Sequence, residues 1–276
     1  MAERRLLSYC AREVRIHQPD RYLATLFAPA AARDALFALY AFDHEIGKVR
    51  HVVRQPIAGL IRLQWWREAL EVIESNRPPA HPVAEALAAV LRDTAGARAR
   101  LGAAIDARER ELEEPPPADL GALEQELEGS AASIVETALL ILGATDQATL
   151  EVGRKVGIVV GLADRLRDLE SDRRRGRLFI PVSELVREDI DPDAAGGGRQ
   201  FEPVIRRLAA RGLEHLRTAR AARRAVPTAG LAALLPGTLA GGQLRRARRT
   251  GSSDALRRPG PAAPLRLLWH HARGRF

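Results

Sequence analysis

The sequence predicts an all-α protein, folded as one domain of eight to ten helices over residues 1–276. Apolar residues recur at three- and four-residue spacing along most of the chain, as in Leu39, Phe42, Ile46 and Val49. Proline and glycine clusters interrupt this pattern at intervals typical of helix connections. Only the short run 177–180 (RLFI) has the character of a strand, so we expect no sheet.

The helices follow one another between these breaks. Pro29 suits a first turn and is followed by a helical pattern over 30–53, and a second helix follows Pro56. The remaining helices are predicted at 82–95, 98–113, 118–143, 147–171, 200–224, 228–248 and 262–273. The glycine-rich tract at 192–199 and the segment 249–262 are predicted to be loops.

Composition restricts the class of protein. The formal net charge is +8 and the sequence pI about 10.7, but basic residues occur along the whole chain and no nucleic-acid-binding motif is present, so we expect no nucleic-acid partner. No apolar run reaches the roughly 18–20 residues of a membrane span, and the N-terminus lacks the apolar core of a signal peptide. The single cysteine, Cys10, rules out a disulfide framework. The expected location is the cytoplasm, with contact at the inner face of a membrane left open.

The stretch 164–181, DRLRDLESDRRRGRLFIP, contains the clearest candidate site. Asp164, Asp168 and Asp172 are four residues apart and share one face of a helix. Carboxylates of this kind hold Mg²⁺ together with the phosphate oxygens of a substrate, and the arginines that follow could bind the same phosphates. Ordinary ion pairs explain the spacing equally well: Asp164 with Arg167, Asp168 with Arg165, and Asp172 with Arg175.

A family resemblance favours the metal hypothesis. Residues 167–181 (RDLESDRRRGRLFIP) resemble the second aspartate motif of the squalene/phytoene synthases, with Asp168 and Asp172 on its two aspartates and Ser171 in place of its usual glutamate. Residues 31–42 (AARDALFALYAF) and 63–70 (LQWWREAL) are similar to further segments of that family. The resemblance implies an isoprenoid synthase helical bundle around a central apolar cavity. It also implies a prenyltransferase that joins two isoprenoid diphosphates head to head and holds them with Mg²⁺.

The first aspartate motif of that family is missing here. Where the family has four acids, this sequence has Gly47, Lys48, His51 and Val52. Only the second motif, Asp168 and Asp172, is left to bind Mg²⁺. Asp43 and Glu45 could form a relocated metal site, or they could face solvent or pair with nearby arginines.

Another resemblance accounts for this loss. Residues 40–73, 105–112, 225–239 and 264–276 resemble the branch of the family that contains the mitochondrial assembly factor for respiratory complex I and its bacterial relatives. That branch implies a protein without catalytic activity whose partners are complex I subunits. Asp168 and Asp172 depart from the branch, which has usually lost both aspartates.

Four further residues are candidates for substrate binding. The family resemblance suggests a diphosphate contact for Arg33, and Arg174 and Arg177 belong to the second motif. Tyr40 could line an isoprenoid pocket or belong to the core. The terminal segment 264–276 is amphipathic, and we expect it to dock on the bundle, with contact to an anionic membrane as the alternative.

Three functions remain open from the sequence. The first is a non-catalytic assembly factor for complex I. The second is an active squalene- or phytoene-type synthase, and the third is a protein that binds an isoprenoid diphosphate without turning it over. The lost carboxylates at Gly47 and Lys48 favour the first and the third.

Overall fold

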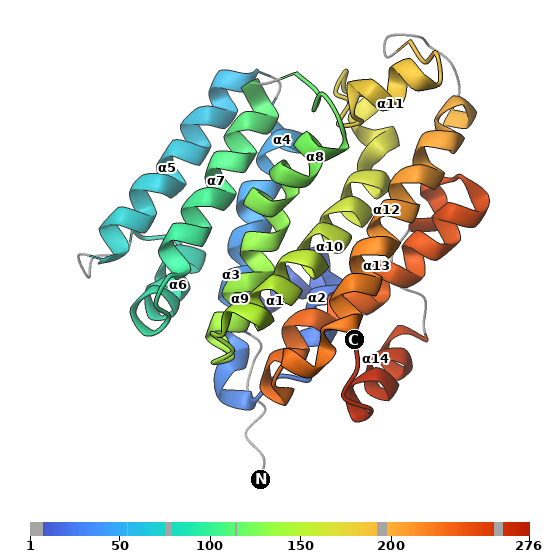
Figure 1. Cartoon of the computed structure of the whole chain (residues 1–276). Coiled ribbons are helices and arrows are strands. Elements are labelled where there is room, and N and C mark those ends of the chain that lie inside the picture. The colour runs from blue at the N-terminus through green and yellow to red at the C-terminus, as the bar shows by residue number, and fades with distance from the viewer. Residues whose placement is uncertain (1–7, 54, 75–78, 114, 192–197, 257–261) are drawn as a thin grey trace.

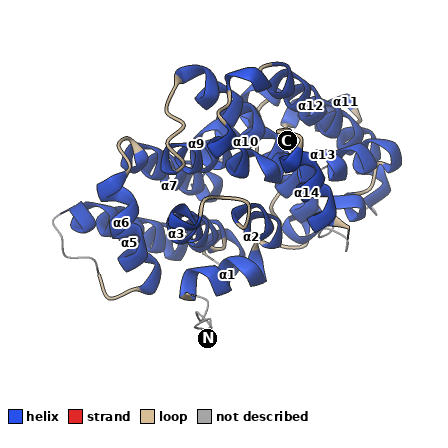
Figure 2. Cartoon of the chain, turned by 90° about the horizontal axis from the view of Figure 1, so that it is seen from below, coloured by secondary structure: helices blue, strands red, loops and turns tan. Residues whose placement is uncertain are grey.

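The computed structural model describes residues 8–53, 55–74, 79–113, 115–191, 198–256 and 262–276. Throughout these residues the chain forms helices joined by loops and turns, and no strand occurs in them (Figure 2). The predicted all-α class is confirmed. The run 177–180, which had the character of a strand, is irregular.

The described residues of the first half of the chain form seven α-helices. They are α1 (Tyr9–His17), α2 (Pro19–Thr25), α3 (Ala30–Gly47), α4 (Val49–Val52), α5 (Pro56–Glu74), α6 (Pro82–Asp93) and α7 (Ala97–Glu113). Side-chain caps fix some of the starts: Ser8 Oγ accepts a hydrogen bond from the Ala11 amide at 3.2 Å at the start of α1.

The second half contains the longest helix. Its α-helices are α8 (Leu120–Leu127), α9 (Ser133–Ile141), α10 (Gln147–Arg173), α11 (Val182–Arg187), α12 (Glu202–Ala221), α13 (Leu231–Thr250) and α14 (Ala263–Ala272). A π-helical turn, η1 (Glu128–Ala132), joins α8 to α9, and single 3₁₀ turns occur at Gly198–Phe201, Arg223–Ala225, Thr228–Gly230 and Ser253–Leu256. Gly251 ends α13 with a φ of 71°, a left-handed conformation that glycine adopts without steric cost.

Helix α10 lies at the centre of the bundle, packed against α9, α12, α13 and η1 (Figure 1). It approaches η1 closely at Gly157, where a Cβ atom would lie 2.2 Å from the Cα of Ala132. Only glycine allows the two backbones to come so near. This contact holds the middle of α10 close to η1.

One large cluster of buried apolar side chains runs from Cys10 to Phe276 and joins the two halves of the bundle. A smaller cluster beside it contains Ala263 and Leu267, through which α14 docks on α2 and α13. No helix in the described ranges is both long enough and apolar enough to cross a membrane. The assignment of residues 1–276 to one domain stays a prediction.

The structure corrects several helix boundaries. The helix predicted over 30–53 breaks near Lys48 into α3 and α4, and the one over 118–143 contains η1 in its middle. Helices α1, α2 and α11 were not predicted, because they are too short for apolar periodicity to identify. Residues 192–197 and 257–261 of the two predicted loops lie outside the described residues. The described parts of these loops contain 3₁₀ turns, which begin at Gly198 and Ser253.

Candidate functional site

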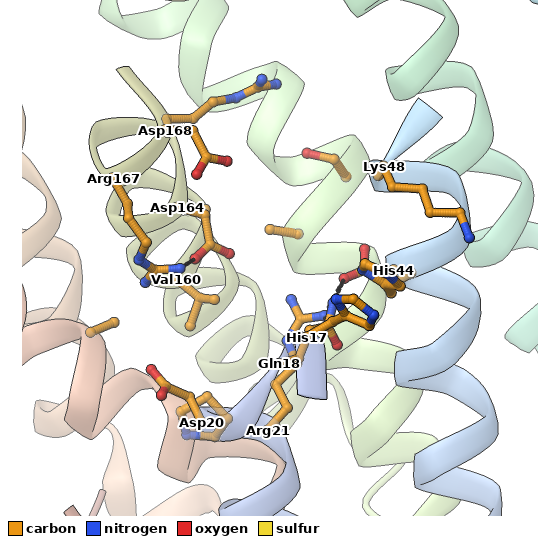
Figure 3. A pocket seen from close by; sticks show the side chains of 18 of the residues that line it. His17, Gln18, Asp20, Arg21, His44, Lys48, Val160, Asp164, Arg167 and Asp168 are labelled. Carbon is orange, nitrogen blue, oxygen red and sulfur yellow. Dashed lines mark hydrogen bonds and ion pairs between the residues drawn. The ribbon is translucent and has the colours of Figure 1, made fainter. Parts of the chain in front are cut away.

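A central cavity of about 340 Å³ opens between α10 on one side and α3 and α4 on the other (Figure 3). The junction of α1 and α2 and the middle of α13 complete its wall, and Figure 3 shows Asp164 and Asp168 of α10 across from His44 and Lys48. The predicted bundle around a cavity is confirmed. The prediction that the space is apolar is wrong, since six arginine or lysine and four aspartate side chains line it together with three histidines.

The three aspartates of α10 share the face that the spacing predicted. Asp164 and Asp168 line the cavity, whereas the side chain of Asp172 is only 2% exposed. Of the ordinary ion pairs predicted for this stretch, one forms: Arg167 Nη1 lies 2.6 Å from Asp164 Oδ1. Arg175 donates instead to the Ser171 hydroxyl.

The cation that serves the aspartate pair is Arg50 of α4. Its Nη2 donates to Asp168 Oδ2 at 2.8 Å and lies 3.7 Å from Asp172 Oδ2. The guanidinium carbon of Arg50 lies 5.1 Å from the centre of the Phe179 ring, a cation–π contact. Arg50 belongs to the degenerate first motif, so a residue of that motif forms ion pairs with the aspartates of the second.

Two other residues of the degenerate motif behave differently from Arg50. His51 approaches Asp168 at 3.7 Å and Asp172 at 3.6 Å, distances too long for hydrogen bonds. Burial and then the neighbouring Arg50 and Arg175 lower the pKa of His51 to about 4, so its ring is neutral at pH 7. Lys48 turns away from α10 and pairs with Glu45 at 2.6 Å.

A third carboxylate, that of Glu111 of α7, also pairs with Arg50. Its side chain is 2% exposed and meets Arg108 at 2.7 Å, Arg50 at 3.5 Å and Arg165 in a close contact. Burial alone would raise the pKa of Glu111, but the three guanidinium groups lower it to about 2. Arg165, which was predicted to pair with Asp168, is held by Glu111 instead.

Asp43, which lines the cavity, extends the same network. Arg21 donates to Asp43 Oδ2, Gln18 Nε2 donates to the same oxygen at 3.0 Å, and Arg108 lies 3.6 Å from Oδ1. Burial opposes ionisation, yet Arg21 and then Arg108 outweigh it and lower the pKa of Asp43. Asp43 is thus an arginine partner, as one of the two expectations for it stated, and Glu45 is paired with Lys48.

The arrangement fits Mg²⁺ poorly at Asp168 and Asp172. A magnesium ion needs open carboxylate oxygens and room for several waters, whereas Arg50 already occupies Asp168 Oδ2 and Asp172 is buried beneath it. Among the described residues no hydrogen bond reaches either oxygen of Asp172, and Arg50 and the Asp168 carboxylate are the charges that act on it most strongly. Burial raises the pKa of both aspartates despite Arg50. The metal assignment stays a prediction, and the guanidinium is the cation that this geometry provides.

Among the described residues, one group has metal-ligand character away from the aspartates. Glu13, His17 and His44 have ligand atoms within 4.8 Å of one another, and the two histidines line the cavity. The two imidazole rings stack with centroids 4.1 Å apart and planes 11° from parallel. Stacked rings direct their nitrogens along separate planes, so one ring would have to turn before both could bind a single ion.

The four residues predicted to bind substrate lie away from the cavity wall. Arg33 donates through Nε to the Ala28 carbonyl at 3.0 Å, and Arg174 is exposed just beyond the end of α10. Arg177 donates to the carbonyl of Arg50 and so anchors α4. Tyr40 is 2% exposed in the core beside Arg21, and burial raises its pKa to about 12. Their roles in binding stay predictions.

The sequence interpretation missed Arg50, Arg108 and Glu111, which form the centre of the charge network. A signal for Arg50 was available. It stands among the positions where the family carries acids, and a cation there faces the surviving aspartates across the cavity. Nothing in the local pattern around Glu111 separates it from the many other acids of α7.

The comparisons with known proteins decide the family. The model of the squalene/phytoene synthase family matches residues 14–267. The chain belongs to the squalene/phytoene synthase family. This match confirms the predicted family. This family member keeps the second aspartate motif and lacks the acids of the first.

Relatives of two kinds are similar to this family member. Bovine (Bos taurus) NADH dehydrogenase (ubiquinone) complex I assembly factor 6 is 28% identical over 230 residues, which cover 82% of this chain and 69% of the relative. Phytoene synthase from Rhodobacter capsulatus is 27% identical over 209 residues, which cover 74% of this chain and 60% of the relative. Both resemblances inferred from the motifs are confirmed.

Solved structures confirm the predicted isoprenoid synthase fold. A dehydrosqualene synthase crystallised with a ligand aligns with a TM-score of 0.82 at 18% identity, covering 96% of this chain and 94% of that one. Squalene synthase HpnC from Alicyclobacillus acidocaldarius aligns with a TM-score of 0.71 at 19% identity, covering 88% of this chain and 92% of that one.

Proposed function

We propose that this family member is a non-catalytic assembly factor for a complex of the NADH dehydrogenase (ubiquinone) type. The similarity to complex I assembly factor 6 supports the role, and its proposed partners are subunits of that complex. The observation that carries the loss of catalysis is the contact of Arg50 with Asp168 at 2.8 Å. A side-chain cation stands where a synthase of this family would be expected to hold a metal ion and a diphosphate.

The chemistry of the family supports this proposal. Head-to-head condensation needs a leaving diphosphate to be neutralised while a carbocation forms, and divalent metal ions held by carboxylates supply that neutralisation. A guanidinium fixed between Asp168 and Glu111 cannot move with a substrate, and its charge is already used by the protein.

The size and lining of the cavity agree with the proposal. A volume of about 340 Å³ lies near the lower end of the roughly 300–1,000 Å³ typical of ligand sites. Two isoprenoid diphosphates would have to share it. Their hydrocarbon chains would also lie against charged side chains such as Arg21, Asp43 and Arg165. Contact with hydrocarbon is unfavourable for charged groups, because it offers them no hydrogen bonds.

The proposal is tested by two separate measurements. Purified protein with Mg²⁺ and either farnesyl or geranylgeranyl diphosphate is expected to yield no squalene, phytoene or presqualene diphosphate. Any product above the no-protein background contradicts the loss of catalysis. Deletion of the gene in its own organism is expected to reduce assembled NADH dehydrogenase on native gels, with restoration by the wild-type gene. Unchanged assembly contradicts the partner assignment.

A second candidate is a protein that binds one isoprenoid diphosphate without turnover. The six cations that line the cavity favour it, since they exceed the four aspartates there. In this candidate Mg²⁺ would be held by Asp168 and Asp172, and Arg33, Tyr40, Arg174 and Arg177 would be its proposed contacts. Each of these six cations already forms an ion pair with a carboxylate of the protein, which makes this the weaker proposal.

The proposed place of action is the cytoplasmic side of a membrane, where the protein would associate peripherally. The similarity to complex I assembly factor 6 supports this location.

A further inference from the structure

The net charge of the chain is concentrated at its C-terminal end. Residues 245–276 contain nine arginines and one acidic residue, Asp254, which gives this segment a formal charge of +8. The first 244 residues contain 34 basic and 34 acidic residues and are neutral overall. Basic residues occur along the whole chain, as the sequence suggested, but summed over the first 244 residues they are balanced by acids, and over residues 245–276 they are not.

The fold gathers four of these arginines on one surface. An open groove of about 580 Å³ runs between the end of α13 and α14, and Arg245, Arg246, Arg249 and Arg266 line it beside Trp269. No acidic residue is among the described residues that line the groove. Burial and then the charges of Arg266 and Arg246 lower the pKa of Arg245, as expected where like charges crowd together. Such a cluster is stabilised by an anion.

Helix α14 adds exposed apolar side chains to the same surface. Its inner face docks on the bundle through Ala263 and Leu267, as the sequence predicted. Its outer face leaves Leu265 70%, Leu268 54% and Trp269 50% exposed. The guanidinium of Arg273 lies 3.9 Å from the centre of the Trp269 ring. Helix α14 therefore has two apolar sides, one packed on the bundle and one exposed.

We propose that the groove between α13 and α14, with the exposed face of α14, binds the surface of an anionic phospholipid bilayer. Arginines attract the lipid phosphates, and leucines with a tryptophan enter the boundary between headgroups and acyl chains. A nucleic acid would also attract the arginines, but the exposed leucines have no role in binding a phosphate backbone. The surface fixes the protein on the membrane through its C-terminal helices.

This inference deepens the proposed function, because it identifies the surface by which the protein would associate with a membrane. Lipid binding is measured without any respiratory subunit present. A failure to bind lipid therefore leaves the assembly role intact, and a failed assembly test leaves the lipid surface intact.

Sedimentation of the full chain with vesicles tests the proposal. The protein is expected to bind vesicles of phosphatidylcholine mixed with an equal amount of phosphatidylglycerol, and not vesicles of phosphatidylcholine alone. Each arginine near an anionic surface contributes about fivefold to binding. The variant Arg245→Ala/Arg249→Ala/Arg266→Ala should therefore bind about a hundredfold more weakly. Salt should weaken binding of the wild type by screening.

Matched controls separate this surface from general charge or stickiness. Arg15→Ala/Arg62→Ala/Arg187→Ala removes three exposed arginines from α1, α5 and α11 and should bind as the wild type does. For the apolar part, Leu265→Ser/Leu268→Ser should weaken binding. Ile57→Ser/Ile61→Ser, with isoleucines 59% and 64% exposed on α5, should not.

A spectroscopic readout covers the case in which a multiple variant fails to fold. Insertion of Trp269 should shift the tryptophan emission of the wild type to shorter wavelength on anionic vesicles, and the conservative variant Trp269→Phe should remove that shift. Equal loss of binding in the surface and control variants overturns the proposal, as does binding of the triple-arginine variant within twofold of the wild type. Tighter binding to a DNA duplex than to vesicles, dependent on the same arginines, also overturns it.

Discussion

Replacing Arg50 with methionine should destabilise the fold by about 3–5 kcal/mol, the usual cost of removing one partner from a buried ion pair. The Arg50 side chain is 7% exposed and touches three carboxylates, those of Asp168, Glu111 and Asp172. Methionine keeps most of the length and the apolar stem of arginine but removes the cation. The carboxylates of Asp172 and Glu111 then stay buried with less compensation.

The magnitude follows from the distances. Nitrogen–oxygen separations of 2.8, 3.5 and 3.7 Å join Arg50 to Asp168, Glu111 and Asp172. At an effective dielectric constant of about 20, one such pair attracts by about 4–6 kcal/mol. Desolvation of the guanidinium offsets a large part of the attraction summed over the three pairs. Asp168 is a third exposed, so solvent screens its share further.

Urea unfolding followed by far-UV circular dichroism measures the effect. Arg62→Met on the exposed side of α5 is the matched control and should change the free energy of unfolding by at most about 0.5 kcal/mol. The variant Arg50→Met/Asp168→Asn/Asp172→Asn should recover part of the loss, because neutral amides need no cation. Mg²⁺ should stabilise Arg50→Met, by about 1.4 kcal/mol at a tenfold excess over Kd, and leave the wild type unchanged.

The reasoning would be refuted by a loss below about 1 kcal/mol in Arg50→Met together with no response to Mg²⁺. That result would mean that solvent, rather than Arg50, balances the aspartates. A wild type that Mg²⁺ stabilises as strongly as the variant would restore the metal site.

Three further predictions concern other parts of the bundle. If a diphosphate binds through Mg²⁺, farnesyl diphosphate with Mg²⁺ should raise the melting temperature in a way that Asp168→Ala abolishes and EDTA reverses; the proposed function predicts no rise in either protein. Burial raises the pKa of Asp20 to about 6, so its ionisation costs stability as pH rises from about 4 through 6. Asp20→Asn should therefore gain about 1–3 kcal/mol at pH 8 and little at pH 4, and an equal gain at both would exclude ionisation as the cause. Gly157→Ala should lower the free energy of unfolding by about 1–3 kcal/mol through its clash with Ala132. The control Gly102→Ala, with open space around it, should leave the free energy of unfolding unchanged or raise it by up to about 1 kcal/mol. Similar unfolding curves for the two variants would show that η1 moves aside.

Local pattern was enough to predict the helices and the aspartate stripe. Helical periodicity depends on residues three and four apart, so the long helices α3, α5 and α10 could be predicted from spacing alone. The same periodicity placed Asp164, Asp168 and Asp172 on one face. It failed for α1, α2 and α11, which have too few turns to show a period.

The sequence by itself determined the family, the all-α fold, the surviving aspartates and the absence of acids at Gly47 and Lys48. Only the tertiary structure decided which cation serves those aspartates, because Arg50 and Asp168 are 118 residues apart and meet only when α4 packs across the cavity from α10. From the sequence, either Arg165 or Arg50 could pair with Asp168, and no local rule decides between them. Packing assigns Arg165 to Glu111 and Arg50 to Asp168, since charge pairing inside a bundle follows the crossing of helices rather than distance along the chain.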